Sequence, residues 1–245
     1  MLIVDSVVKT FGRRAAVDRV SFELATGEVL GFLGPNGAGK TTVMRMIAGR
    51  LEPDSGRVQV GTFDMLSDRR QGQRLVGYLP EGAPAYRTMT PREFVGFCLA
   101  ARGWSGRDLV LARDRALERA RLGETADQQV GTLSKGYKRR AALAAAISHD
   151  PPLLVLDEPT DGLDPNQKHE VRALIREMAA DKAIIVSTHI LEEVPAVCSR
   201  VIVIADGTIL VDENPDEFAS RARTGRLDDA FRSLTRPSKL DEAAA

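Results

Sequence analysis

The pattern G-x-x-x-x-G-K-[ST] directly follows the apolar run 29–33 and reads Gly34-Pro35-Asn36-Gly37-Ala38-Gly39-Lys40-Thr41. A loop with this pattern, placed between a strand and a helix, wraps the phosphates of a nucleotide. Gly37 and Gly39 lack side chains, so backbone N–H groups can approach phosphate oxygens closely. We expect Lys40 to reach the outer phosphates and the Thr41 hydroxyl to hold Mg²⁺.

Two neighbouring carboxylates, Asp157 and Glu158, directly follow the apolar segment 153–156. If that segment is a buried strand of a parallel sheet, both carboxylates emerge at its carboxyl end, where such sheets bind ligands. Phosphoryl transfer needs a carboxylate that holds a metal and a group that positions the attacking water. We therefore assign Asp157 to Mg²⁺ through a water molecule, and Glu158 to the attacking water as general base. The alternative is an exposed acidic pair in a loop.

These groups need a sheet that positions them. Apolar and alternating segments predict strands at 2–8, 17–24, 29–33, 57–60, 75–79, 153–156, 183–187, 201–205 and 208–211, with 57–60 at an edge. Helices are predicted from Lys40 to about Arg50, from Ser134 to about Ser148, and over 165–180. Strands that alternate with helices are typical of an α/β fold whose sheet is covered on both faces.

A helical block interrupts this alternation from Thr90 to about Ala126. Thr90 is a suitable N-cap, Pro91 falls at the first helical position, and Glu93 lies three residues after the cap. The block separates the phosphate-loop region from the carboxylate pair. We expect it to form an inserted helical subdomain.

Composition excludes several classes of function. Among 245 residues, 34 basic and 34 acidic side chains give a net charge of zero, which argues against a general nucleic-acid binder. The only cysteines, Cys98 and Cys198, are too few for a disulfide framework or a zinc cluster. No signal peptide is recognisable, and no stretch approaches the roughly 18 apolar residues of a spanning helix. We expect a cytoplasmic protein that meets a membrane only through a partner.

Six motifs in this order resemble those of the nucleotide-binding subunit of ABC (ATP-binding cassette) transporters, over about residues 2–213. They are Gly34–Thr42 (Walker A), Glu81 (the Q-loop position), Leu133-Ser134-Lys135-Gly136-Tyr137 (the signature), Leu153–Glu158 (Walker B), Gly162-Leu163-Asp164 (the D-loop) and His189 (the switch histidine). The resemblance implies a P-loop NTPase with a RecA-like core and parallel sheet, an N-terminal antiparallel β subdomain and a helical subdomain at about 86–135. It implies one nucleotide-binding domain over 1–236, and we expect 237–245 to be a flexible tail.

The resemblance also implies a mechanism in which two subunits enclose ATP and Mg²⁺. One subunit supplies the residues that hold the nucleotide, and the second covers it with Ser134 and Gly136. Catalysis is then assigned to Glu158, Lys40 and the γ-phosphate sensor His189. The nucleotide contacts are Phe11, Val17, Asn36, Gly37, Ala38, Gly39, Lys40, Thr41, Thr42, Glu81, Ser134, Gly136 and Asp164, and the metal is assigned to Thr41, Glu81 and Asp157.

Local alternatives stand beside two of these assignments. Phe11 has the aromatic face that stacks on adenine, and a core phenylalanine is the competing interpretation. Asp164 is assigned to the dimer interface, whereas an Asp directly before Pro165 is also a turn-forming residue.

Two departures from the family pattern point to a subgroup. Glu81 replaces the usual glutamine, and Lys135 and Tyr137 replace the commoner Gly and Gln of the signature. Both resemble members that mostly serve exporters with separate permease subunits. The implied partners are transmembrane permease subunits and a second copy of this chain or a related ATPase, without nucleic acid. The alternative is a soluble ABC-type ATPase that acts as an assembly factor or scaffold. A GTP switch is excluded because the chain has no Asn-Lys-x-Asp guanine reader.

Five of the aromatic residues fall within a short stretch around the start of the helical block: Tyr78, Tyr86, Phe94, Phe97 and Trp104, with Met89 among them. We predict an exposed aromatic groove that takes a short helix of a permease. The alternative is a tightly packed subdomain core. Charge reversal near Arg87 and Arg92 tests the groove.

Overall fold

A six-stranded sheet forms the centre of the structure, which is a computed structural model that describes residues 1–188 and 191–235. Its order is β10–β9–β3–β8–β7–β6, and β9, β3, β8, β7 and β6 are mutually parallel. The bounds are β3 Val29–Leu33, β6 Val76–Leu79, β7 Leu153–Asp157, β8 Ala183–Ser187, β9 Arg200–Ala205 and β10 Thr208–Glu213. Only β10 runs antiparallel, beside β9. The strands expected here from the sequence are confirmed.

Both faces of this sheet are buried, which explains why its strands read as continuous apolar runs. Along β7, Leu153 and Val155 pack with the N-terminal strands, while Leu154 and Leu156 pack with the helices of the opposite face. The core on the side of the N-terminal strands includes residues of α1 (Lys40–Ile47). The core on the opposite face includes residues of α5 (Lys135–Ile147) and α6 (Pro165–Met178). Successive side chains of a strand therefore contribute to two separate cores.

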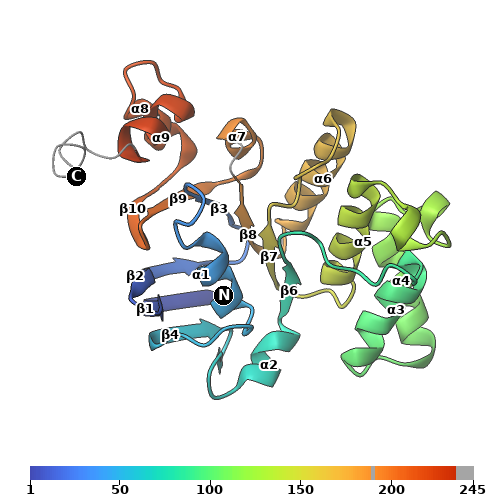
Figure 1. Cartoon of the computed structure of the whole chain (residues 1–245). Helices are drawn as coiled ribbons and strands as arrows, with labels where there is room; N and C mark the ends of the chain where they lie inside the picture. Colours follow the sequence, from blue (N-terminus) through green and yellow to red (C-terminus); the bar gives the residue numbers. More distant parts are fainter. Residues whose placement is uncertain (189–190, 236–245) are drawn as a thin grey trace.

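A second, antiparallel sheet has the order β2–β1–β4–β5, with β1 Leu2–Phe11, β2 Arg14–Leu24, β4 Ser55–Val60 and β5 Phe63–Asp64. The prediction that 57–60 is an edge strand was wrong, because β4 lies between β1 and β5. β5 has only two residues, too few for a period-2 pattern to reveal it. In Figure 1 this sheet lies on the side of the molecule away from helices α3 and α4.

The block that reads as helical contains α3 (Pro91–Ala101) and α4 (Gly106–Arg119), which pack against each other and against α5. The predicted capping box is confirmed: the Thr90 side chain accepts the Glu93 N–H, and the Glu93 carboxylate accepts the Thr90 N–H at 2.8 Å. Three short 3-10 segments, Gly123–Thr125, Val130–Thr132 and Leu191–Glu193, and helix α2 (Arg69–Arg74) complete the connections.

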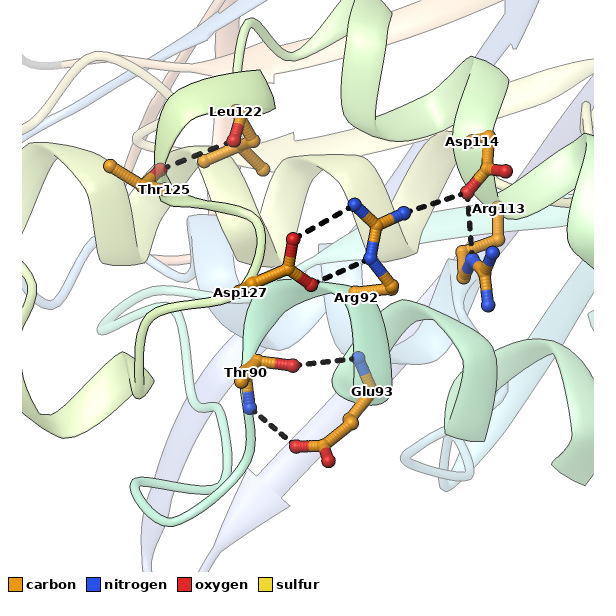
Figure 2. A network of polar contacts seen from close by, with 8 residues as sticks. All are labelled: Thr90, Arg92, Glu93, Arg113, Asp114, Leu122, Thr125 and Asp127. Carbon is orange, nitrogen blue, oxygen red and sulfur yellow. Dashed lines mark hydrogen bonds and ion pairs between the residues drawn. The ribbon is translucent and has the colours of Figure 1, made fainter.

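Arg92 holds this block together. Its guanidinium donates to both carboxylate oxygens of Asp127 and to Asp114, as Figure 2 shows, and Arg113 shares Asp114. These partners hold the pKa of Asp127 and of Asp114 below the usual range, chiefly through hydrogen bonds to Arg92 and to Arg113, respectively. Arg92 is thus committed to a network within the block, so charge reversal there would disturb the fold and is not a clean test of the groove.

The chain continues after β10 into α8 (Pro215–Ser220) and α9 (Leu227–Thr235), and α7 (Val194–Val197) precedes β9. The segment after β10 thus forms two separate helices. Ala230 is fully buried and Phe231 packs against the large helical-face core, and α9 contacts the segment Leu191–Glu193. Among the helices that the structure describes, none combines the length and the apolar character needed to cross a bilayer.

His149 makes the stability of this fold depend on pH. Burial and the nearby Arg102 lower the pKa of His149 to about 4, against 6.5 for an unperturbed ring. Between these values the unfolded chain binds a proton that the native ring does not, so the free energy of unfolding falls as the pH falls from about 6.5 to 4. We expect a loss of up to about 3 kcal/mol over this range.

Urea unfolding from pH 7 to pH 4.5 measures this loss. His149→Gln, which retains polar groups but does not titrate, should show a shallower pH dependence than the unchanged chain. Equal pH dependences of the two proteins would contradict the assignment.

Candidate nucleotide site

The phosphate loop leaves the carboxyl end of β3 and enters α1. Its path needs glycine at two places where backbone approaches backbone: a Cβ on Gly34 would collide with the carbonyl oxygen of Ile204, and one on Gly39 with that of Ala16. Gly39 also has a φ of +108°, a conformation that is open to glycine and costly for other residues. The loop is therefore held in shape by neighbouring strands before any ligand arrives.

Lys40 begins α1 and is 8% exposed. Its ammonium donates to the carbonyl oxygens of Gly34 (2.6 Å) and Pro35 (3.0 Å), so it lies across its own loop. Burial lowers the pKa of Lys40, and the carboxylates Glu158, Asp157 and Glu81 act in the opposite direction. A cation surrounded by loop carbonyls and three carboxylates can exchange these partners for phosphate oxygens.

Thr41 and Asp157 meet at the carboxyl ends of β3 and β7. The Thr41 hydroxyl donates to one carboxylate oxygen of Asp157 at 3.0 Å, and the Ser187 hydroxyl donates to the other. Asp157 is 1% exposed and lies opposite Ser187 in the register of β7 and β8. A hydroxyl and a carboxylate are oxygen donors of the kind that Mg²⁺ prefers, so the pair fits a magnesium ion.

Glu158 occupies the turn after β7 with a φ of +53°, in the left-handed region. Its N–H donates to the Ser187 hydroxyl at 2.9 Å, and its carbonyl oxygen accepts from Arg139. This conformation costs a residue with a Cβ about 1–2 kcal/mol, and contacts with the surrounding structure must offset that cost. His189, the predicted sensor, lies outside the described residues.

Glu81 follows β6, the strand beside β7, and its side chain is exposed. Its charge acts on both Lys40 and Arg139, which places it at the same edge of the sheet as the carboxylate pair. The other phosphate-loop candidates, Asn36, Gly37, Ala38 and Thr42, lie in the loop or the first turn of α1, and Ala38 is buried.

Phe11 and Val17 come from the hairpin of β1 and β2, and their surroundings differ. Phe11 is 54% exposed, so its interpretation as a core residue is wrong, while its stacking on adenine stays a prediction. Val17 is fully buried in the core beneath the phosphate loop and presents no free surface here. Its contact with adenine also stays a prediction.

Ser134 and Gly136 stand at the N-terminus of α5. Ser134 caps this helix by accepting the Tyr137 N–H. Gly136 is buried, and a Cβ at this position would displace the amide end of the Gln167 side chain. Asp164 caps α6 by accepting the Gln167 N–H at 2.9 Å, so its local role as a turn and capping residue is confirmed. Lys135 pairs with Asp161 at 2.9 Å.

The sequence analysis does not identify two residues of the site, Ser187 and Arg139. It places Ser187 only at the end of a strand, although a polar residue that closes an apolar strand was a signal of a role at the site. Arg139 is 4% exposed and bonds the backbone of the Asp157–Glu158 turn. Its only signal in the sequence was a basic residue at the edge of the alanine-rich, buried part of a helix.

The phosphate loop, the parallel sheet and the carboxylates at its carboxyl edge define a P-loop nucleotide-binding protein with an added antiparallel sheet and a helical insertion. A sequence model of the family described as "ABC transporter" matches residues 17–161. The chain belongs to the ATP-binding proteins of the ABC transporter family.

Similar proteins agree with this assignment. A Bacillus subtilis (strain 168) protein, "Uncharacterized ABC transporter ATP-binding protein YxlF", is 39% identical over 209 residues, which cover 85% of this chain and 69% of that protein. "Nod factor export ATP-binding protein I" of Rhizobium sp. (strain N33) is 40% identical over 210 residues, with the same two coverages. A solved "ATP binding subunit of ABC transporter" superposes with a TM-score of 0.86 at 26% identity, covering 96% of this chain and all of that one.

Proposed function

We propose that this chain hydrolyses ATP with Mg²⁺ as one half of a dimer and thereby drives a separate membrane permease, in the direction of export. The observation that carries the proposal is the convergence of Thr41, Asp157 and Glu158 at one sheet edge, next to a preformed phosphate loop. Mg²⁺ held by Thr41 and Asp157, with Glu81 nearby, would neutralise charge on the phosphate oxygens.

Hydrolysis then requires proton transfer at Glu158. Its carboxylate takes a proton from water as the water oxygen bonds to the γ-phosphorus. The bond from that phosphorus to the bridging oxygen breaks, and its electron pair stays on ADP. Lys40 exchanges its loop carbonyls for phosphate oxygens and stabilises the charge there. We assign the sensing of the γ-phosphate to His189.

A second copy is part of the proposal because Ser134 and Gly136 stand at the N-terminus of α5, whereas the phosphate loop leads into α1. These helices pack in two different cores on opposite faces of the sheet. This placement on opposite faces supports contacts of the two groups with two different nucleotides, as a dimer would provide. A solved bacterial ABC transporter cassette with a TM-score of 0.79 and 26% identity is described as dimeric, and it covers 88% of this chain.

Export is favoured by the departures at Glu81 and Lys135 and by the name of the Rhizobium relative, an export ATP-binding protein. Glu81→Gln tests the first of these. Because an amide oxygen can still face the metal, we expect this variant to retain ATPase activity within about threefold. Turnover with saturating ATP measures it, and a collapse of turnover with ATP binding intact would show that the carboxylate itself is needed.

A groove of about 870 Å³ is the proposed contact with the permease, which would hold the chain at the inner face of the membrane. The aromatic side of the groove contains Tyr86 and Phe97, both exposed, whose rings stand 5.5 Å apart, together with the buried Phe94. Tyr86 and Phe97 support an exposed aromatic groove, whereas Phe94 is buried, as the alternative of a packed core expects. Tyr78, which is partly buried, also lines the groove. Trp104 lines a different cavity, beside α4.

The lining of the groove is also basic. None of its described lining residues is acidic. Five arginines line it: Arg45, Arg50, Arg70, Arg74 and Arg102. A groove lined by aromatic side chains and by arginines fits an amphipathic helix with aromatic or aliphatic residues on one face and carboxylates on the other. We therefore assign the groove to such a segment of the permease.

Charge reversal tests this assignment. Arg74→Glu on the groove should weaken the binding of a synthetic amphipathic helix bearing glutamates by at least about tenfold, since one favourable charge contact becomes repulsive. Arg107→Glu, an exposed residue of α4 outside the groove, is the matched control. The same pair of variants is then compared for co-purification with a multi-spanning protein after mild solubilisation of membranes.

Equal binding of the glutamate helix by all three proteins would refute the groove assignment. If ATP-driven dimers form but no multi-spanning protein co-purifies with the unchanged chain, an assembly factor that works without a permease is supported instead.

A further inference from the structure

Arg139 is a buried cation in contact with the Asp157–Glu158 turn, which we call the catalytic turn. It lies on α5, is 4% exposed, and donates through one nitrogen to the carbonyl oxygens of Asp157 (2.9 Å) and Glu158. Its Nε finds no hydrogen-bond partner within the part of the chain that the structure describes. Burying a guanidinium group with one donor unused costs free energy. We therefore looked for the groups that this charge serves.

The charges around Arg139 indicate what it serves. Burial lowers the pKa of Arg139, and Asp161, Asp157, Glu158 and Glu81 oppose that effect. These four carboxylates belong to the nucleotide edge of the sheet. The positive charge of Arg139 therefore offsets the mutual repulsion of the groups that must surround the metal and the attacking water.

The backbone of Glu158 is held from two sides. Ser187, on β8, accepts its N–H, and Arg139, on α5, donates to its carbonyl oxygen. Because Glu158 has a φ of +53°, the turn needs such partners to keep this conformation. If either partner moves, the direction of the Glu158 side chain changes with the backbone.

Arg139 also connects this turn to a different part of the molecule. Ser134 caps the same helix five residues earlier, and α5 packs against α3 and α4. In Figure 1, α5 lies between the central sheet and these two helices. A shift of α5 therefore moves the group that holds Glu158.

We propose that Arg139 is the positioning residue of the catalytic carboxylate, and that through it the placement of α5 controls whether Glu158 is aligned for hydrolysis. Ser134 and Gly136 on α5 are proposed to contact the nucleotide of the second copy, so Arg139 links occupancy of one site to readiness of the other. The inference rests on the proposed role of Glu158 as general base.

Arg139→Met removes the donors and keeps much of the volume. Arg140→Met is a matched control: Arg140 is the next residue, is 6% exposed, and binds Glu170 at 2.7 Å, away from the catalytic turn. We expect Arg139→Met to lower kcat at least about tenfold with the ATP concentration for half-maximal rate within about twofold, as for a residue that acts on the transition state. Arg140→Met should lower the melting temperature and leave kcat within about twofold.

Three further measurements separate positioning from a general structural role. Arg139→Lys, which keeps one donor group, should restore part of kcat. In the Glu158→Gln background, Arg139→Met should add less than about twofold in single-turnover hydrolysis, because residues that act through one another are not additive. Amide hydrogen exchange over 153–161 in the nucleotide-free chain should become faster in Arg139→Met and stay unchanged in Arg140→Met.

Each contrary result has a distinct meaning. Equal kcat for the Met variants at 139 and 140, or multiplied effects of Arg139→Met and Glu158→Gln, would overturn the role of Arg139. Hydrolysis by Glu158→Gln at the normal rate would instead overturn the proposed base, whatever Arg139 does.

Discussion

Glu158→Gln is expected to lower ATP hydrolysis by at least about 100-fold, because the amide cannot accept the proton of the attacking water and general-base catalysis contributes about 10²–10⁴ in rate. The amide is nearly the same size as the carboxylate, and the bonds that hold this turn use the backbone of Glu158. ATP binding should therefore persist, and the ATP-bound dimer should accumulate, since the step that separates the two copies is blocked.

Phosphate release measures the first effect, and size-exclusion chromatography with ATP and Mg²⁺ measures the second. Glu124→Gln, an exposed residue of the helical block, serves as the control for loss of one negative charge. Hydrolysis at the unchanged rate would refute the base assignment, and the absence of any ATP-dependent dimer would refute the two-copy mechanism.

Gly39→Ala is expected to abolish most nucleotide binding. The added Cβ would collide with the carbonyl oxygen of Ala16, and the φ of +108° is unfavourable for alanine. Both conflicts involve backbone, so a change of rotamer cannot relieve them and the loop itself must move. We expect the dissociation constant for ATP to rise by about 10- to 100-fold, which corresponds to about 1.4–2.8 kcal/mol.

A matched glycine separates collision from backbone strain. Gly27 has a φ of +91°, and apart from its chain neighbours no described atom lies within 4 Å of an added Cβ. Gly27→Ala should lower the free energy of unfolding by about 1–2 kcal/mol and leave ATP affinity unchanged. Titration with a fluorescent ATP analogue compares the variants. Equal affinities of the two would show that the loop tolerates the displacement.

Much of the fold was predictable because its signals are local. The runs 29–33, 153–156 and 183–187 are buried on both faces, so apolar character alone marks them as strands of a covered sheet. Thr90 and Glu93 lie three residues apart, and their reciprocal bonds need no distant partner. The prediction that 57–60 is an edge strand was wrong because its neighbour β5 has only two residues. Two residues are too few to show an alternating pattern in the sequence.

The candidate site divides in the same way. The phosphate loop consists of adjacent residues, and so does the Asp157–Glu158 pair. The residues themselves therefore indicate a nucleotide and a metal. The roles of Arg92 and Arg139 were not predictable. Arg92 meets Asp127 across 35 positions, and Arg139 meets Glu158 across 19, and nothing in the neighbouring residues of either arginine indicates its partner.

The sequence by itself determined the chemistry that we propose for this protein, because a phosphate loop and a strand ending in two carboxylates each depend on adjacent residues. Tertiary structure alone decided where the individual arginines lie and which groups they contact. Arg92, Arg74 and Arg139 are the same residue type, and packing directs the first to a carboxylate network, the second to a groove and the third to the Asp157–Glu158 turn. The physical reason is that the surroundings of a guanidinium group consist of residues that are distant along the chain.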